Sequence, residues 1–110
     1  MPNPLRVLDA ARRVVDEINE LLAHSGARLL YEEDIRDAAE SITASIREAY
    51  GRREGAERNQ FFRYARGSAE ETDEHMGPNF RIRRIDAPRY WRIHNRLAAI
   101  VKMLNSLMND

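Results

Sequence analysis

The chain contains no cysteine among its 110 residues. Disulfide bonds, zinc sites built from thiolates and cysteine nucleophiles are therefore all excluded. It has no apolar run of about 18 residues that would span a membrane, and its first residues lack a signal-peptide pattern. We therefore expect a soluble, cytoplasmic protein with no membrane partner. The length fits one domain over residues 1–110, since compact domains typically have about 100–150 residues.

An excess of charge of one sign is also absent, because 18 basic and 18 acidic side chains give a formal net charge of zero. Of the basic residues, 17 are arginine, and Lys102 is the only lysine. Arginine forms forked contacts with phosphate and carboxylate groups. A GC-rich genome produces the same bias, and the scatter of arginine along the whole chain favours that explanation.

Glycine and proline are scarce, with five and four copies, and they separate four stretches with apolar residues every three or four positions. In the first stretch one apolar stripe runs from Leu5 to Leu22, with Val7, Val14 and Leu21 beside it. Gly26 is a helix stop signal, and the Gly77-Pro78 pair ends the third helix because proline cannot continue the hydrogen-bond ladder. The pattern predicts helices over residues 4–24, 30–51, 56–76 and 87–108. Short joints between them predict an all-α, antiparallel up-and-down four-helix bundle.

The predicted buried faces differ in width. The second helix has a narrow face of small residues, made of Ile35, Ala38 or Ala39, Ile42, Ile46 and Ala49. The fourth helix has a heptad seam, made of Tyr90, His94, Leu97, Val101, Leu104 and Met108. Ile93, Ile100 and Leu107 form a second seam on its flank. This wider apolar face predicts a protein–protein contact in addition to the core.

Two segments of the chain resemble a known family. The first runs Ser41-Ile42 and then Ser45-Ile46-Arg47-Glu48-Ala49-Tyr50-Gly51-Arg52-Arg53, and the second runs from Tyr64 to Glu71. They resemble the four-helix-bundle proteins encoded in intervening sequences of bacterial 23S rRNA genes, with the pattern S-I-x-x-N-I-A-E-G-Y-G-R-R followed by I-A-x-G-S-x-x-E-x-E. The residues that match the pattern are Glu48, Tyr50, Gly51, Arg52, Arg53, Gly67, Ser68 and Glu71. The sequence departs from it at Ser45, Arg47, Ala49, Arg58 and Thr72.

The resemblance implies a ring-shaped oligomer, because related members form pentamers, and we therefore expect a homopentamer. One branch of the family is the accessory variability protein of diversity-generating retroelements. That branch has a basic surface, binds nucleic acid and partners a reverse transcriptase. The resemblance therefore implies RNA or DNA and a partner enzyme as candidate partners of this chain.

Positive charge is concentrated in residues 80–102, where seven basic residues stand against Asp86 alone. Phosphate contacts dominate the affinity of nucleic-acid-binding proteins, so this segment is a candidate RNA or DNA interface through Arg81, Arg83, Arg84, Arg89, Arg92 and Arg96. Tyr90, Trp91 and His94 are interleaved with them, and aromatic rings stack on exposed bases. The alternative is that these arginines pair across the bundle or between subunits with Glu32, Glu33, Asp34, Asp37 and Glu70–Glu74. Overall neutrality favours this alternative.

The residues of the family motif predict structure rather than chemistry. Glu48, Ser68 and Glu71 are candidates for a buried polar network where the second and third helices face each other, and Gly67 would permit a close approach. The partners available to these carboxylates are Arg63, Tyr64 and Arg66. Arg52 and Arg53 follow Gly51 at a helix end, where cations complement the helix dipole.

No enzyme motif is present, and we predict no catalytic residue, no metal site and no cofactor. A di-iron bundle needs Glu-x-x-His pairs, whereas Glu20/His24 and Glu71/His75 are four residues apart. The serines lack a G-x-S-x-G context, and no glycine-rich phosphate loop occurs. We therefore predict a non-catalytic, oligomeric binding or scaffold protein that contacts RNA or DNA through its arginine-rich segment. The alternative is a purely structural assembly protein, with Arg–Glu contacts between subunits and no nucleic-acid ligand.

Overall fold

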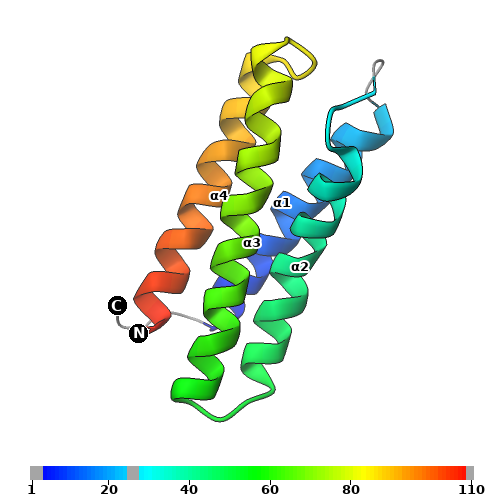
Figure 1. Cartoon of the computed structure of the whole chain (residues 1–110). Coiled ribbons are helices and arrows are strands. Elements are labelled where there is room, and N and C mark those ends of the chain that lie inside the picture. Colours follow the sequence, from blue (N-terminus) through cyan, green and yellow to red (C-terminus); the bar gives the residue numbers. More distant parts are fainter. Residues whose placement is uncertain (1–3, 25–27, 109–110) are drawn as a thin grey trace.

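The computed structural model describes residues 4–24 and 28–108 and contains four α-helices. They are α1 (Pro4–His24), α2 (Glu32–Tyr50), α3 (Ala56–Arg81) and α4 (Ala87–Met108). Consecutive helices run in opposite directions, so α1 begins and α4 ends at the same end of the molecule (Figure 1). Within the described residues, α1 packs on α2 and α4, and α3 packs on the same two helices. The predicted antiparallel four-helix bundle is confirmed, with extents of 44 × 22 × 19 Å.

The predicted limits agree with the structure at two of the four helices. The first and fourth agree with residues 4–24 and 87–108, and the second is shorter than predicted by about one turn in total. Asp86 caps α4 as its sequence position indicates, because its Oδ2 accepts a hydrogen bond from the Arg89 backbone N–H at 3.0 Å. Residues 1–3 and 25–27, which include the Gly26 stop signal, lie outside the described residues.

The predicted end of the third helix at Met76 is wrong, because α3 continues through Pro78 to Arg81. The helix ends three residues after Pro78, with a Schellman-type pattern of hydrogen bonds. The N–H of Arg84 donates to the carbonyl of Asn79 at 2.8 Å, and the N–H of Arg83 donates to that of Phe80 at 3.0 Å. Arg83 has a φ of 62°, so an arginine occupies the left-handed position that glycine usually fills.

Asn79 explains why the last turn of α3 survives the proline. Its side chain is fully buried and makes three hydrogen bonds to backbone groups. Its Oδ1 accepts from the N–H of Leu30 at 2.7 Å, and its Nδ2 donates to the carbonyls of Leu30 and His75 at 2.9 and 3.0 Å. The segment before α2 is thereby fastened to the end of α3, and this tertiary contact offsets the bond that proline cannot make.

The core is formed by one apolar stripe from each helix. The predicted face of α2 is confirmed, and both Ala38 and Ala39 are buried. In α4, however, the buried stripe combines residues of both predicted seams, and Leu107 of the second seam is only partly buried. The buried residues of α4 are Ile93, Leu97, Ile100, Leu104 and Met108, whereas Tyr90, His94 and Val101 lie on the flank toward α3. In α1 the second stripe is the more deeply buried, and Leu5 is 63% exposed.

Candidate nucleic-acid interface

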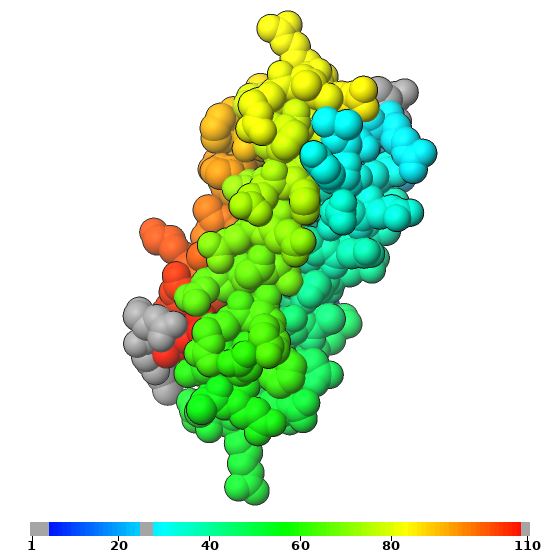
Figure 2. Space-filling view, viewed as in Figure 1, coloured from blue at the N-terminus to red at the C-terminus, as the bar shows by residue number. Residues whose placement is uncertain are grey.

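The six candidate arginines divide into two groups in space. Arg81, Arg83 and Arg84 lie at the end of α3 and in the turn to α4, which projects from one end of the molecule (Figure 2, yellow). Arg89, Arg92 and Arg96 follow each other along α4 at a spacing of three and four residues, so they share one face of that helix.

The turn group carries positive charge without compensating carboxylates. All three residues are exposed. The guanidinium of Arg84 donates a hydrogen bond to the backbone carbonyl of Arg28. Within residues 4–24 and 28–108, neither Arg81 nor Arg83 forms an ion pair with a carboxylate. This turn is therefore the part of the segment where positive charge remains available to a ligand.

The helix group, in contrast, is largely paired within the chain. Glu17 of α1 accepts from Arg96 at 2.7 Å and pairs with Arg92 at 3.2 Å. The Glu17 side chain is only 15% exposed, so this carboxylate lies between two guanidinium groups that bridge α1 and α4. Arg89 pairs with Asp86 at 3.7 Å. These pairs lie within one chain, but none uses the acidic residues that the sequence alternative named.

The aromatic residues lie on the other flank of α4. The rings of Phe80 and Tyr90 are stacked with their centroids 4.2 Å apart, and Tyr90 is also stacked on His94 at 5.8 Å. Trp91 meets all three rings edge to face and is 49% exposed. The structure therefore separates residues that the sequence interleaves: the aromatic group faces α3, and Arg92 and Arg96 face α1.

His94 is held by a carboxylate of α3. Its Nδ1 lies 2.8 Å from Oδ1 of Asp73, so the histidine is satisfied by a hydrogen bond, as its seam position indicates, although it is only half-buried. Burial, together with the negative charge of Asp73, raises the pKa of Tyr90, while Arg81 acts in the opposite direction. The charge of Arg81 thus acts on the aromatic group, although Arg81 lies at the end of α3 beside the turn.

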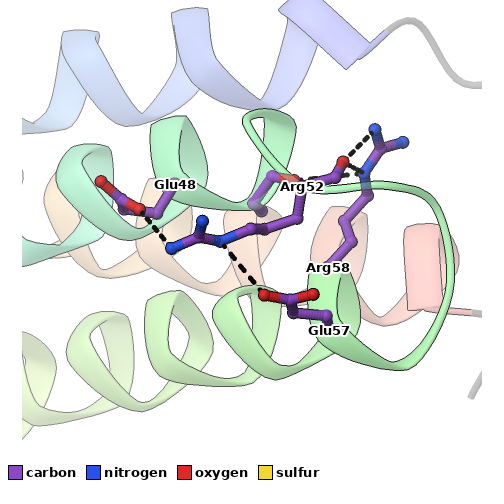
Figure 3. Close-up of polar contacts among 5 residues, drawn as sticks. Glu48, Arg52, Glu57 and Arg58 are labelled. Carbon is purple, nitrogen blue, oxygen red and sulfur yellow. Dashed lines mark hydrogen bonds and ion pairs between the residues drawn. The ribbon is translucent and has the colours of Figure 1, made fainter.

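The family-motif residues surround the turn between α2 and α3. Arg52 pairs with Glu48 at 3.2 Å and with Glu57 at 3.6 Å, so it links the end of α2 to the start of α3 (Figure 3). Gly55 has a φ of 127°, a conformation that requires glycine. The short turn between Gly51 and Gly55 is as the sequence predicts, and Arg53 is exposed within it.

The predicted buried network of Glu48, Ser68 and Glu71 is wrong. The side chains of Glu48 and Glu71 are 58% and 56% exposed, and Glu71 pairs with His75 at 3.7 Å. Ser68 makes a single link between the helices, donating to Oγ of Ser41 at 3.0 Å. Gly67 is exposed, and a Cβ added to it would meet no atom within 4 Å, so it permits no close approach. Helical periodicity points these residues along the rim of the α2–α3 contact rather than into it.

Arg58 has a structural role that sequence reasoning missed. Its guanidinium donates to the carbonyls of Ala49 at 3.1 Å and Arg52 at 2.7 Å, so it caps the end of α2 (Figure 3). It also lies 5.5 Å from the ring centroid of Tyr50. The signal was present in the sequence, because Arg58 replaces the aromatic residue of the family pattern next to the motif that it caps.

Among the described residues, Tyr50 has the one buried side-chain polar atom that lacks a hydrogen-bond partner. Its hydroxyl is buried and has no hydrogen-bond partner within residues 4–24 and 28–108. Burial raises the pKa of this tyrosine, and Arg58 lowers it by a smaller amount. Its ring packs edge to face against Phe62 at 5.5 Å. The aromatic ring therefore packs into the core, while the unpaired hydroxyl lowers the stability of the fold.

The described part of the chain has neither a metal-binding cluster nor a membrane-spanning helix. No group of three or more histidine, aspartate or glutamate residues there is arranged to hold a metal ion. None of the helices described is long and apolar enough to cross a bilayer.

Comparison with known proteins places this bundle in a family. The model of the 23S rRNA-intervening sequence protein family matches residues 3–106. The crystal structure of a protein of unknown function, from the S23 ribosomal protein family of Bacteroides thetaiotaomicron, has the same fold with a TM-score of 0.89. It is 24% identical, and the match covers 97% of this chain and 98% of that one. No curated protein matches this chain. The chain therefore belongs to the family of 23S rRNA-intervening sequence proteins.

Proposed function

We propose that this protein is a non-catalytic, oligomeric scaffold that contacts RNA or DNA through its arginine-rich segment. The observation that carries the proposal is the uncompensated charge of Arg81 and Arg83 at the projecting turn. Glu17 adds to this argument, because one carboxylate shared by Arg92 and Arg96 leaves an excess positive charge on α4. Exposed guanidinium groups of this kind attract phosphate and release its counterions.

The finer parts of the proposal follow from the family resemblance. We take the assembly to be a ring-shaped homopentamer in the cytoplasm, with a partner enzyme analogous to the reverse transcriptase that the accessory variability protein assists. The resemblance of the Glu48–Arg53 segment, at the end of α2 and in the turn to α3, to the family motif supports this part of the proposal.

The second candidate is a structural assembly protein without a nucleic-acid ligand. It is supported by an open groove of about 430 Å³ between α1 and α4. Arg6, Arg13 and Arg96 line this groove, beside Asp9 and an apolar floor that includes Met103. Exposed acidic residues of α2 offer a complementary surface on another copy, and they are Glu33, Asp34, Asp37 and Glu40. In this alternative the arginines belong to contacts between subunits.

The test compares charge reversal at two places with equal change in net charge. Arg81→Glu with Arg83→Glu removes the free turn charges, and Arg36→Glu with Arg63→Glu, both exposed elsewhere, is the matched control. Binding of a fluorescent structured RNA and of a DNA duplex is titrated at about 50 and 200 mM salt, with assembly mass measured in parallel. We expect the turn variant alone to lose affinity, with the slope of log K against log salt reduced by roughly two.

Two results would count against the proposal. If neither nucleic acid binds at low salt, where surface charge is least screened, the nucleic-acid function is refuted. If the turn variant binds as the control does, Arg81 and Arg83 do not contact the nucleic acid, and the proposed interface is refuted. The assembly alternative makes a different prediction, that Arg6→Glu with Arg13→Glu lowers the mass of the assembly, and a monomer in the wild type would refute both the ring and that alternative.

A further inference from the structure

We propose that the exposed indole of Trp91 is a stacking platform for an unpaired base, so that single-stranded nucleic acid is the substrate class. This inference rests on the proposed function and goes beyond it, because free arginines alone bind duplex and single strands without distinction. The observations that carry it are the exposure of Trp91, the geometry of the rings around it and the charges beside them.

The rings around Trp91 lie across the indole and leave much of it exposed. Tyr90 is stacked on Phe80 and on His94, with interplanar angles of 4° and 19°. Tyr90 meets Trp91 nearly at right angles, at 5.1 Å and an interplanar angle of 76°. Phe80 and His94 also meet the indole nearly at right angles, at 5.8 and 5.3 Å. The three neighbouring rings thus lie across the plane of the indole rather than stacked on it, and 49% of Trp91 remains exposed to a ligand.

The rings that surround Trp91 are held in place by contacts with α3. His94 is fixed by its hydrogen bond to Asp73 at 2.8 Å, and Phe80 belongs to the last turn of α3. The buried side chain of Asn79 fastens this last helical turn to the backbone of Leu30. A ring held in place loses little conformational freedom when a base stacks on it, so the binding energy is retained.

The charges favour nucleic acid over an apolar protein surface as the occupant. Arg81 lies close enough to Tyr90 to influence its ionisation, and it has no carboxylate partner among the described residues. Arg83 and Arg84 follow in the same turn. Asp73 is the carboxylate in contact with the platform, and its Oδ1 is bonded to His94. An exposed aromatic ring in a segment rich in arginine matches the combination that proteins use to bind single strands.

Trp91 is the only tryptophan in the chain, so its fluorescence reports on the platform directly. Wild-type protein is titrated with an oligothymidine of about 12 nucleotides, a length within known single-strand site sizes, and with a duplex of the same length. We expect the single strand to quench the indole fluorescence and to bind about tenfold or more tighter than the duplex, because paired bases are not available for stacking.

Variants test whether the ring itself is responsible. With a labelled oligothymidine, Trp91→Leu should weaken binding roughly 5- to 150-fold, whereas Trp91→Phe keeps an aromatic face and should retain most of the affinity. Tyr64→Leu is the matched control, since Tyr64 is 51% exposed and lies in an earlier part of α3. Thermal unfolding by circular dichroism checks that each variant is folded.

Each contrary outcome identifies what has failed. If the oligothymidine binds without changing Trp91 fluorescence, or if Trp91→Leu binds like Tyr64→Leu, the platform is refuted, and the arginine interface stands. If no nucleic acid binds at all, both the proposed function and the stacking platform are refuted. If Trp91→Leu lowers the assembly mass and the single strand does not quench, the indole lies between copies of the chain, which also overturns the proposal.

Discussion

Replacing Asn79 tests the contact that decides how α3 ends. We consider Asn79→Ala, which removes three hydrogen bonds from a fully buried position. A hydrogen bond inside a protein contributes about 0.5–1.5 kcal/mol net, and a buried group left without its partner costs about 1–3 kcal/mol. The backbone groups of Leu30 lose their partners but regain some water, because Leu30 is 38% exposed. We therefore expect a loss of about 2–4 kcal/mol in the free energy of unfolding.

The assay is urea unfolding followed by circular dichroism, with thermal unfolding alongside. For a domain of this size the loss corresponds to a fall in Tm of roughly 8–16 °C. The matched control is Asn95→Ala, an exposed position of α4, where we expect a change of less than about 0.5 kcal/mol. Asn79→Asp separates the bonds, because a carboxylate still accepts from the N–H of Leu30 but cannot donate to the two carbonyls.

Hydrogen exchange locates the effect within the chain. The amide of Leu30 donates to Asn79, so its protection should fall in Asn79→Ala far more than protection in the middle of α2. The reasoning is refuted if Asn79→Ala costs less than about 1 kcal/mol, or if the Leu30 amide exchanges as slowly as in the wild type. Either result would mean that α3 passes Pro78 for another reason.

Three further perturbations follow from the structure. Tyr50→Phe removes a buried hydroxyl without a partner in the described residues, so we expect a gain in stability of up to about 1 kcal/mol by urea unfolding, and a clear loss would contradict this. Arg83→Gly relieves a left-handed backbone and should stabilise the protein by about 1 kcal/mol, whereas Arg83→Ala keeps the strain and should not. The raised pKa values of Tyr50 and Tyr90 mean that these groups ionise more readily in the unfolded chain, so their contribution is complete below about pH 10 and is lost as pH rises above it. The urea midpoint measured between pH 9 and 11 should fall, and it should fall less when both tyrosines are phenylalanine.

The family motif shows how resemblance and geometry contribute different information. The match over residues 3–106 establishes the family and agrees with the motif read from the sequence. It does not place the side chains, and the buried network inferred for Glu48 and Glu71 proved to be an exposed rim. Arg58, which the motif comparison marks as a departure, is the residue that caps α2.

Periodicity and punctuation were sufficient for the architecture. Apolar residues at a helical spacing define four stripes, and a bundle with short connections is the simplest way to bury all four. The cap at Asp86 and the turn between Gly51 and Gly55 depend on neighbouring residues only, so they were also predictable.

Tertiary contacts alone decided the rest, because they join residues that are far apart in the chain. The passage of α3 through Pro78 depends on Asn79 and Leu30, which are separated by 49 positions. The pairing of Arg96 with Glu17 spans 79 positions, and it removes from the candidate interface a charge that the sequence counts as free. The separation of the α4 arginines from the aromatic rings also results from contacts between helices, because α1 pairs with the arginines and α3 packs against the rings. Local sequence determines which helices form, but only their packing determines which side chains remain available to a ligand.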